Sequence, residues 1–66
     1  MKIFLNGTEA ETRGAHTLAD LVRAYQLPAP TLLIEYNGRA LHQHEWGTQP
    51  LHHGDRIEFV RIVAGG

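Results

Sequence analysis

The stretch that decides the fold runs over residues 17–26 and reads TLADLVRAYQ. Its apolar residues recur at i, i+3, i+4 and i+7, which places Leu18, Leu21, Val22 and Tyr25 on one face of a helix. Thr17 is a suitable N-cap, and Asp20 adds favourable charge and a weak capping box in the first turn. Because Pro28 disfavours helical geometry in the residue before it, the pattern predicts one amphipathic helix over residues 17–26.

An Asn-Gly pair lies on each side of this helix. Asn6-Gly7 separates an apolar strand over residues 1–5 from an alternating segment over 8–12, and Asn37-Gly38 separates a strand over 31–36 from residues 39–41. A type I′ turn needs positive φ at both central residues, so Asn-Gly between two runs is a strong hairpin signal. The sequence therefore predicts two β-hairpins.

The last third of the chain ends in a strand. Residues 42–51 have no clear period, which indicates an irregular crossover with one helical turn near 44–46. A turn at 53–55 precedes a strand over 56–63 and a tail over 64–66 that we expect to be flexible. The order β-β-α-β-β-β predicts one α+β domain over residues 1–66, with the helix packed across a mixed sheet. The expected core comprises Ile3, Leu5, Leu18, Leu21, Val22, Ile34, Leu41, Ile57 and Phe59, with Trp46 covering one end.

Composition excludes several classes of function. The chain has 66 residues, no cysteine and a formal charge of −1, so thiol catalysis and disulfides are excluded and nucleic acid is not an expected partner. No apolar run approaches the roughly 20 residues that cross a bilayer, so we expect no membrane partner. A soluble, cytoplasmic protein is expected.

The order of these features resembles the ubiquitin-like β-grasp fold. The ending DRIEFVRIVAGG over residues 55–66, together with Glu45-Trp46 in the crossover, resembles the ThiS family, the sulfur carriers of thiamine biosynthesis. The resemblance covers essentially the whole chain.

This resemblance implies a carrier rather than an enzyme. A ThiF-type adenylating enzyme would use ATP to activate the carboxylate of Gly66, and a relay from a cysteine desulfurase would convert it to a thiocarboxylate. A ThiG-type thiazole synthase would then take the sulfur. The carrier itself would bind no cofactor and no metal.

The residue types of the tail fit that role. Gly65 and Gly66 have no Cβ, and Ala64 has only a methyl group, so the tail can enter a narrow channel in a partner. A terminal glycine also leaves its carbonyl unhindered. The preceding strand would anchor the tail to the rigid domain.

A docking face follows from strand parity. Ile57 and Phe59 share one side of the last strand, so Val60 and Ile62 fall on the other. Phe4 has the opposite parity to Ile3, so we expect it to join them, together with Leu33. An apolar cluster on an uncovered sheet face is expected to bind a partner.

Other functions remain open from the residues alone. The five histidines, with His42 and His44 two residues apart, would allow a metal site, but no cysteine supports it. A ubiquitin-like binding module has no need of a terminal diglycine. A carrier for molybdopterin or another sulfur metabolite, or a protein-conjugating modifier, would have the same kind of ending.

Overall fold

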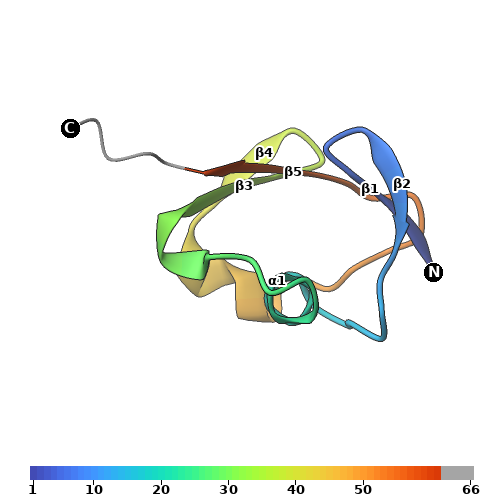
Figure 1. Cartoon of the computed structure of the whole chain (residues 1–66), viewed down its shortest axis with the longest axis horizontal. Helices are drawn as coiled ribbons and strands as arrows, with labels where there is room; N and C mark the ends of the chain where they lie inside the picture. Colours follow the sequence, from blue (N-terminus) through green and yellow to red (C-terminus); the bar gives the residue numbers. More distant parts are fainter. Residues whose placement is uncertain (62–66) are drawn as a thin grey trace.

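Five strands form one sheet, and the helix crosses one face of that sheet (Figure 1). The structure is a computed structural model that describes residues 1–61. Its elements are β1 (Lys2–Leu5), β2 (Thr8–Glu11), α1 (Leu18–Ala24), the 3₁₀ helix η1 (Ala29–Thr31), β3 (Leu32–Tyr36), β4 (Arg39–Leu41), the 3₁₀ helix η2 (Gln43–Thr48) and β5 (Arg56–Arg61). Both predicted hairpins form.

The last described strand lies at the centre of the sheet. The strand order is β2-β1-β5-β3-β4. β5 runs parallel to β1 and antiparallel to β3, and both hairpins are antiparallel. The sheet is therefore mixed, as predicted, and each hairpin lies on one side of β5.

α1 is shorter than predicted because its two ends are capping residues. Thr17 Oγ1 accepts a hydrogen bond from Asp20 N at 3.1 Å, and Asp20 Oδ2 accepts one from Thr17 N at 3.2 Å. At the other end Gln26 has φ +53, and Leu27 N donates to Val22 O at 3.0 Å. Left-handed geometry with this bond is the Schellman termination. Within residues 1–61 no helix is long and apolar enough to cross a membrane.

The core lies between the sheet and the helices. Predicted members Ile3, Leu18, Leu21, Val22, Ile34, Leu41 and Ile57 are buried, while Leu5 and Phe59 are half-buried against them. Ala15, Leu32 and Leu51 are buried although the sequence did not predict them. Ala15 and Leu51 lie in segments without periodicity, and a hydrogen bond of 3.0 Å from Leu51 N to His16 O joins these segments.

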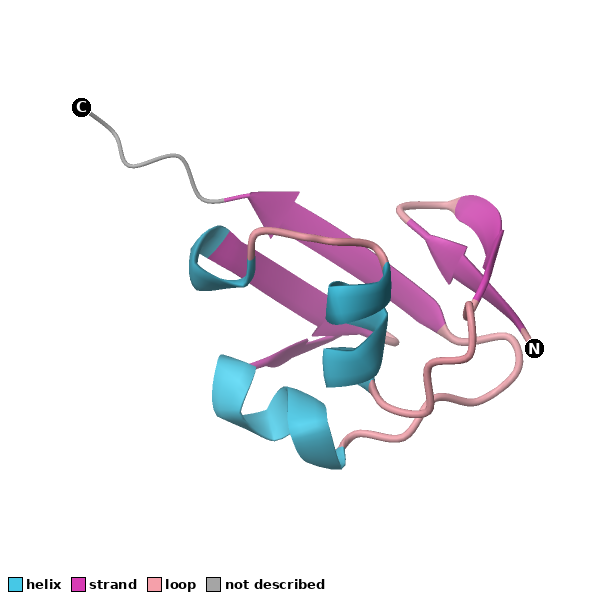
Figure 2. Ribbon diagram, turned by 60° about the horizontal axis from the view of Figure 1, so that its bottom comes forward, coloured by secondary structure: helices cyan, strands magenta, loops and turns pink. Residues whose placement is uncertain are grey.

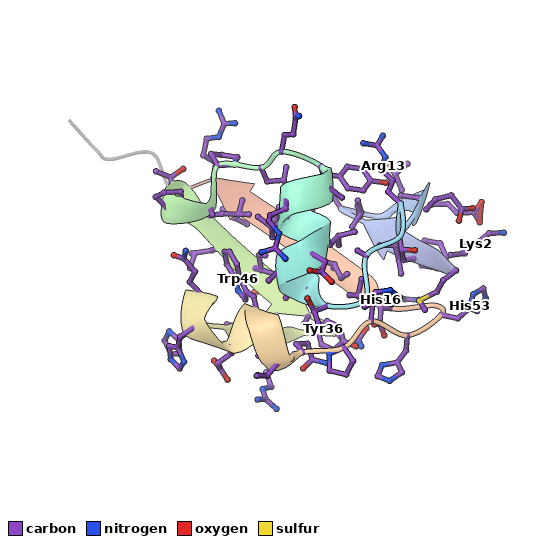
Figure 3. All side chains as sticks on the ribbon, turned by 90° about the horizontal axis from the view of Figure 1, so that it is seen from below. Lys2, Arg13, His16, Tyr36, Trp46 and His53 are labelled. Carbon is purple, nitrogen blue, oxygen red and sulfur yellow. The ribbon has the colours of Figure 1, made fainter. Side chains whose placement is uncertain are left out.

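Trp46 closes the core from η2. This helix is longer than the single turn predicted, and Glu45 Oε1 accepts a hydrogen bond from His42 N at its start, at 2.9 Å. η2 contacts α1 on the same side of the sheet (Figure 2). Trp46 is 3% exposed and points inward from η2 (Figure 3), so its predicted position is confirmed.

Candidate functional site

The candidate site consists of β5 and the sheet face that the helices leave uncovered (Figures 1 and 2). Val60 and Phe4, two of the predicted site residues, lie on this face. The other predicted site residues lie outside the described residues: Ile62, Ala64, Gly65 and Gly66.

Two asparagines fix β5 from both sides. Asn6 Oδ1 accepts a hydrogen bond from Phe59 N at 2.7 Å, and Asn37 Oδ1 accepts one from Arg56 N at 2.8 Å. Both asparagines have φ +49 in their hairpin turns. The two Asn-Gly pairs therefore do more than reverse the chain, because their side chains also bind the central strand.

A carboxylate fixes the start of β5. Asp55 is buried, and its Oδ2 accepts hydrogen bonds from the Tyr36 hydroxyl at 2.5 Å and from His52 N at 2.7 Å. Its Oδ1 accepts one from Asn37 Nδ2 at 3.1 Å. Its backbone carbonyl accepts one from Phe4 N at 2.8 Å. Asp55 thus connects β5 to both hairpins, which gives the Gly54-Asp55 turn a structural role.

Burial and the contact with Asp55 change the pKa of the Tyr36 hydroxyl. Burial, followed by the hydrogen bond and charge of Asp55, raises the pKa of Tyr36 from 10.0 to about 12. Both causes favour the neutral phenol, which donates to the carboxylate. The network is therefore intact at neutral pH.

Val60 forms an apolar pair on the open face. β3 and β5 place Leu33 directly opposite Val60, and these side chains are 51% and 54% exposed. Ile57 is fully buried on the other side of β5, which confirms the parity predicted for this strand. We call Leu33 and Val60 the apolar pair.

Phe4 occupies a separate part of the same face. It lies opposite Arg56 in the register of β1 and β5. Together with Gly7, Ile57 and Glu58, these two residues line a hollow of about 330 Å³. Val60 lies four residues after Arg56 on β5, which is about 13 Å along the strand. Phe4 and Val60 therefore share a face without forming one continuous cluster.

Two carboxylates lie between these parts, and sequence reasoning did not identify them. Glu35 and Glu58 are directly opposite each other in the register of β3 and β5, and both are exposed. We call them the acidic pair. They are 23 positions apart in the sequence, so only the pairing register of the two strands brings them together. No local sequence pattern predicts this register.

The histidines are dispersed over the described part of the chain. His42 and His44 stack with ring centroids 5.6 Å apart. His53 Nδ1 accepts a hydrogen bond from Lys2 N at 3.3 Å, and His52 Nδ1 lies 3.4 Å from the Tyr36 hydroxyl. Among residues 1–61, no group of three or more His, Asp or Glu side chains has the geometry to hold a metal ion.

A family model and a curated relative match nearly the whole chain. The model of the ThiS family matches residues 3–66. A relative from Trieres chinensis, the uncharacterized protein ycf40, is 33% identical over 63 residues, which are 96% of this chain and 86% of that protein.

Solved structures agree with the family match. The crystal structure of a thiamine biosynthesis protein (ThiS) from Geobacter metallireducens is 26% identical, covers 100% of both chains and has a TM-score of 0.85. A solution structure of a thiamine biosynthesis protein from the same organism is 26% identical, has a TM-score of 0.77 and covers 100% of this chain and 88% of its own. The chain therefore belongs to the ThiS family, the sulfur carriers of thiamine biosynthesis with a ubiquitin-like β-grasp fold.

Proposed function

We propose that the chain carries sulfur as a thiocarboxylate on Gly66. A ThiF-type enzyme transfers AMP from ATP to the Gly66 carboxylate, with release of pyrophosphate. The outer sulfur of a persulfide, supplied through a cysteine desulfurase, then attacks the acyl adenylate and displaces AMP, which leaves an acyl disulfide between the chain and the sulfur donor. A thiol reduces this disulfide, becomes part of a new disulfide with the donor, and releases the thiocarboxylate. A ThiG-type thiazole synthase accepts the sulfur for thiazole formation, and the chain is a protein substrate of both enzymes.

The observation that carries this proposal is the family match over residues 3–66, which includes the terminal Gly65-Gly66. The described structure supports it by its architecture. β5, which leads toward the tail, is hydrogen-bonded at both sides and is bound by Asn6, Asn37 and the Asp55 network. A rigid central strand is a suitable base for a segment that must reach into another protein.

The docking surface for these partners is the open sheet face. We assign it to the apolar pair, with Phe4 at the far side, and we include Ile62, which follows two residues after Val60 in the sequence. Exposed apolar residues on an uncovered face, next to the strand that leads to the reacting carboxylate, are where a partner has to bind.

Intact-protein mass spectrometry tests the chemistry. The chain is incubated with ATP, cysteine, a cysteine desulfurase and the adenylating enzyme, beside a variant that lacks Gly66. The expected result is a mass gain equal to the replacement of one oxygen by sulfur, absent in the variant. No gain, with an adenylating enzyme that is active on another carrier, would refute the proposal. Transfer of the sulfur to thiazole synthase, and not to a molybdopterin synthase large subunit, would establish the pathway.

A further inference from the structure

We propose that the acidic pair, Glu35 and Glu58, contributes to selection of the adenylating enzyme by binding an arginine guanidinium group of that enzyme. The partner would place an arginine against these two carboxylates while an apolar part of its surface covers Leu33 and Val60. This inference rests on the proposed function, because it describes the partner that docks on the same face.

The acidic pair is unfavourable in the isolated chain. Glu35 and Glu58 are directly opposite in the register of antiparallel strands. Such residues point to the same face with Cβ atoms about 4.5–5.5 Å apart, and like charges there repel. β5 is the central strand of the sheet and β3 is its neighbour. The acidic pair therefore lies near the middle of the open face.

The acidic pair also differs from every other carboxylate side chain of residues 1–61. Glu9, Glu11 and Glu45 form ion pairs with Lys2, the N-terminal amine and Arg39. Asp20 pairs with Arg23, and Asp55 accepts hydrogen bonds from Tyr36 and Asn37. Within the described residues, neither Glu35 nor Glu58 has a cation within 4.0 Å or a side-chain hydrogen bond. The two charges without a partner are thus the two that face each other.

The nearest cation on this face does not neutralise the pair. Arg56 has the parity of Glu58 and lies two residues before it on β5, about 6–7 Å along the strand. Arg56 and Glu58 both line the hollow beside Phe4, but Arg56 has no carboxylate oxygen within 4.0 Å among the described residues. It also lies on the side of Glu58 that is away from the apolar pair.

The register joins the two pairs into one surface of four residues. Leu33 faces Val60, and two positions along each strand Glu35 faces Glu58. Half of this surface is apolar and half is doubly negative. An arginine matches it, because its apolar stem can cover the leucine and valine while its planar, multi-donor guanidinium binds two carboxylates at once.

This arrangement would give specificity. A partner without a cation here would have to bury two like charges, which is strongly unfavourable, whereas an arginine relieves their repulsion and satisfies their oxygens. The apolar pair alone would bind any apolar surface. The acidic pair therefore restricts which apolar surface can dock.

The double variant Glu35→Gln/Glu58→Gln tests the inference, because stability and binding should change in opposite directions. Gln keeps the shape of Glu and removes the repulsion, so the urea midpoint of the variant should rise. Its dissociation constant for the adenylating enzyme should increase about tenfold or more, and the salt dependence of binding should become weaker.

A matched control removes the same charge from the same face. In Glu9→Gln/Glu11→Gln, both substituted residues lie opposite outward-facing residues of β1 but already pair with cations of this chain. Its dissociation constant should stay within about twofold of that of the unmodified chain, since Lys2 and the N-terminal amine already lie within 4.0 Å of these carboxylates. Equal weakening in both variants would indicate a net-charge effect and would overturn the inference.

Other outcomes are equally decisive. An acidic-pair variant that becomes more stable and binds as tightly as the unmodified chain would show that the pair has no role in docking. A variant that becomes less stable would contradict the repulsion itself. The mass gain is measured separately at saturating adenylating enzyme. If the unmodified chain binds the enzyme but shows no mass gain, the carrier chemistry is refuted. The dissociation constants still test the docking surface in that case.

Discussion

Gln26 shows how a single residue is held in an unfavourable conformation by its context. It has φ +53 at the end of α1, where its N–H donates to Arg23 O at 3.0 Å. A side chain with a Cβ loses about 1–2 kcal/mol in this left-handed region, and glycine does not. The hydrogen bonds that end α1 and the burial of its apolar face offset this loss.

Replacement of Gln26 by glycine is therefore expected to stabilise the protein. The gain should be about 0.5–1 kcal/mol, because relief of the backbone strain exceeds the added entropy of a glycine in the unfolded chain. Urea unfolding followed by the fluorescence of Trp46, the one tryptophan of the chain, measures it. Gln26→Ala keeps a Cβ and should give no gain. Equal stabilisation by both variants would show that strain is not the cause.

Val60 is the residue at which docking can be tested separately from folding. Because its side chain is 54% exposed on the open face, Val60→Asp should change stability by only about 0.5 kcal/mol. It should weaken binding to the adenylating enzyme at least tenfold, since a carboxylate next to the acidic pair has to be desolvated on docking.

The matched control for Val60→Asp adds the same charge at another exposed site. Gln43→Asp on η2 serves this purpose, since η2 lies on the helical side of the sheet. Isothermal titration of both variants against the same enzyme makes the comparison. If Val60→Asp fails to fold, or if both variants bind alike, the assignment of the face is wrong.

At the scale of elements, β5 is fixed by side chains at its start and along its length. Asn37 binds Arg56 N at the start of β5 and also Asp55 just before it, and Asn6 binds Phe59 N. The hydrogen bond from Tyr36 links β3 to the same carboxylate. These contacts connect both hairpins to the strand that leads to the tail, so their loss should loosen the whole sheet.

Removal of the Tyr36 hydroxyl tests this connection through pH. The pKa of Tyr36 is raised to about 12 in the folded protein from 10.0. A raised folded pKa contributes stability that is complete below pH 10 and is lost as the pH rises toward 12. Tyr36→Phe should therefore be less stable than the unmodified chain at neutral pH, and the difference should shrink between pH 10 and 12. Urea midpoints of both proteins across this range measure it.

Tyr25 provides the control for the alkaline range, since its hydroxyl donates to a backbone carbonyl, Glu11 O, at 2.7 Å and not to a carboxylate. Tyr25→Phe removes a phenol without touching Asp55. A difference between Tyr36→Phe and the unmodified chain that stays constant from neutral pH to pH 12 would contradict the role of the Asp55 contact.

The whole molecule has little stability to lose. For 66 residues, a typical value of 0.05–0.15 kcal/mol per residue gives about 3–10 kcal/mol in total. The core of residues 1–61 is formed by side chains from the sheet, α1, η2 and the loops, and Ile57 from the central strand is completely buried in it. A cavity at this position affects every layer of the fold.

Ile57→Ala should therefore remove a large part of the total stability. The expected loss is about 2–5 kcal/mol, from lost transfer free energy and the cavity that remains. The fluorescence of Trp46 in a urea titration reports it. Val60→Ala, three residues along the same strand on the open face, should lose less than about 1 kcal/mol. Similar losses at both positions would contradict the placement of the two faces of β5.

Sequence reasoning was most successful where a local signal exists. The i, i+3, i+4 spacing identified α1, the Asn-Gly pairs identified both hairpins, and alternation identified the buried side of β5. It was weaker for Ala15 and Leu51, which are buried by a contact between two irregular loops. The range predicted for the helix also included Thr17, Tyr25 and Gln26, because the apolar spacing continues to Tyr25, which is the C-cap.

By itself, the sequence determined the helix, the two hairpins and the fold class, because turn chemistry and periodicity are each encoded within a few neighbouring residues. It did not predict η1, which takes Thr31 from the strand predicted over 31–36. Only the tertiary structure decided which distant residues meet. The opposition of Glu35 to Glu58, the separation of Phe4 from Val60 and the binding of β5 by two turn asparagines all depend on strand register. Register is set by the packing of the whole sheet on one core, so no local stretch of sequence contains it.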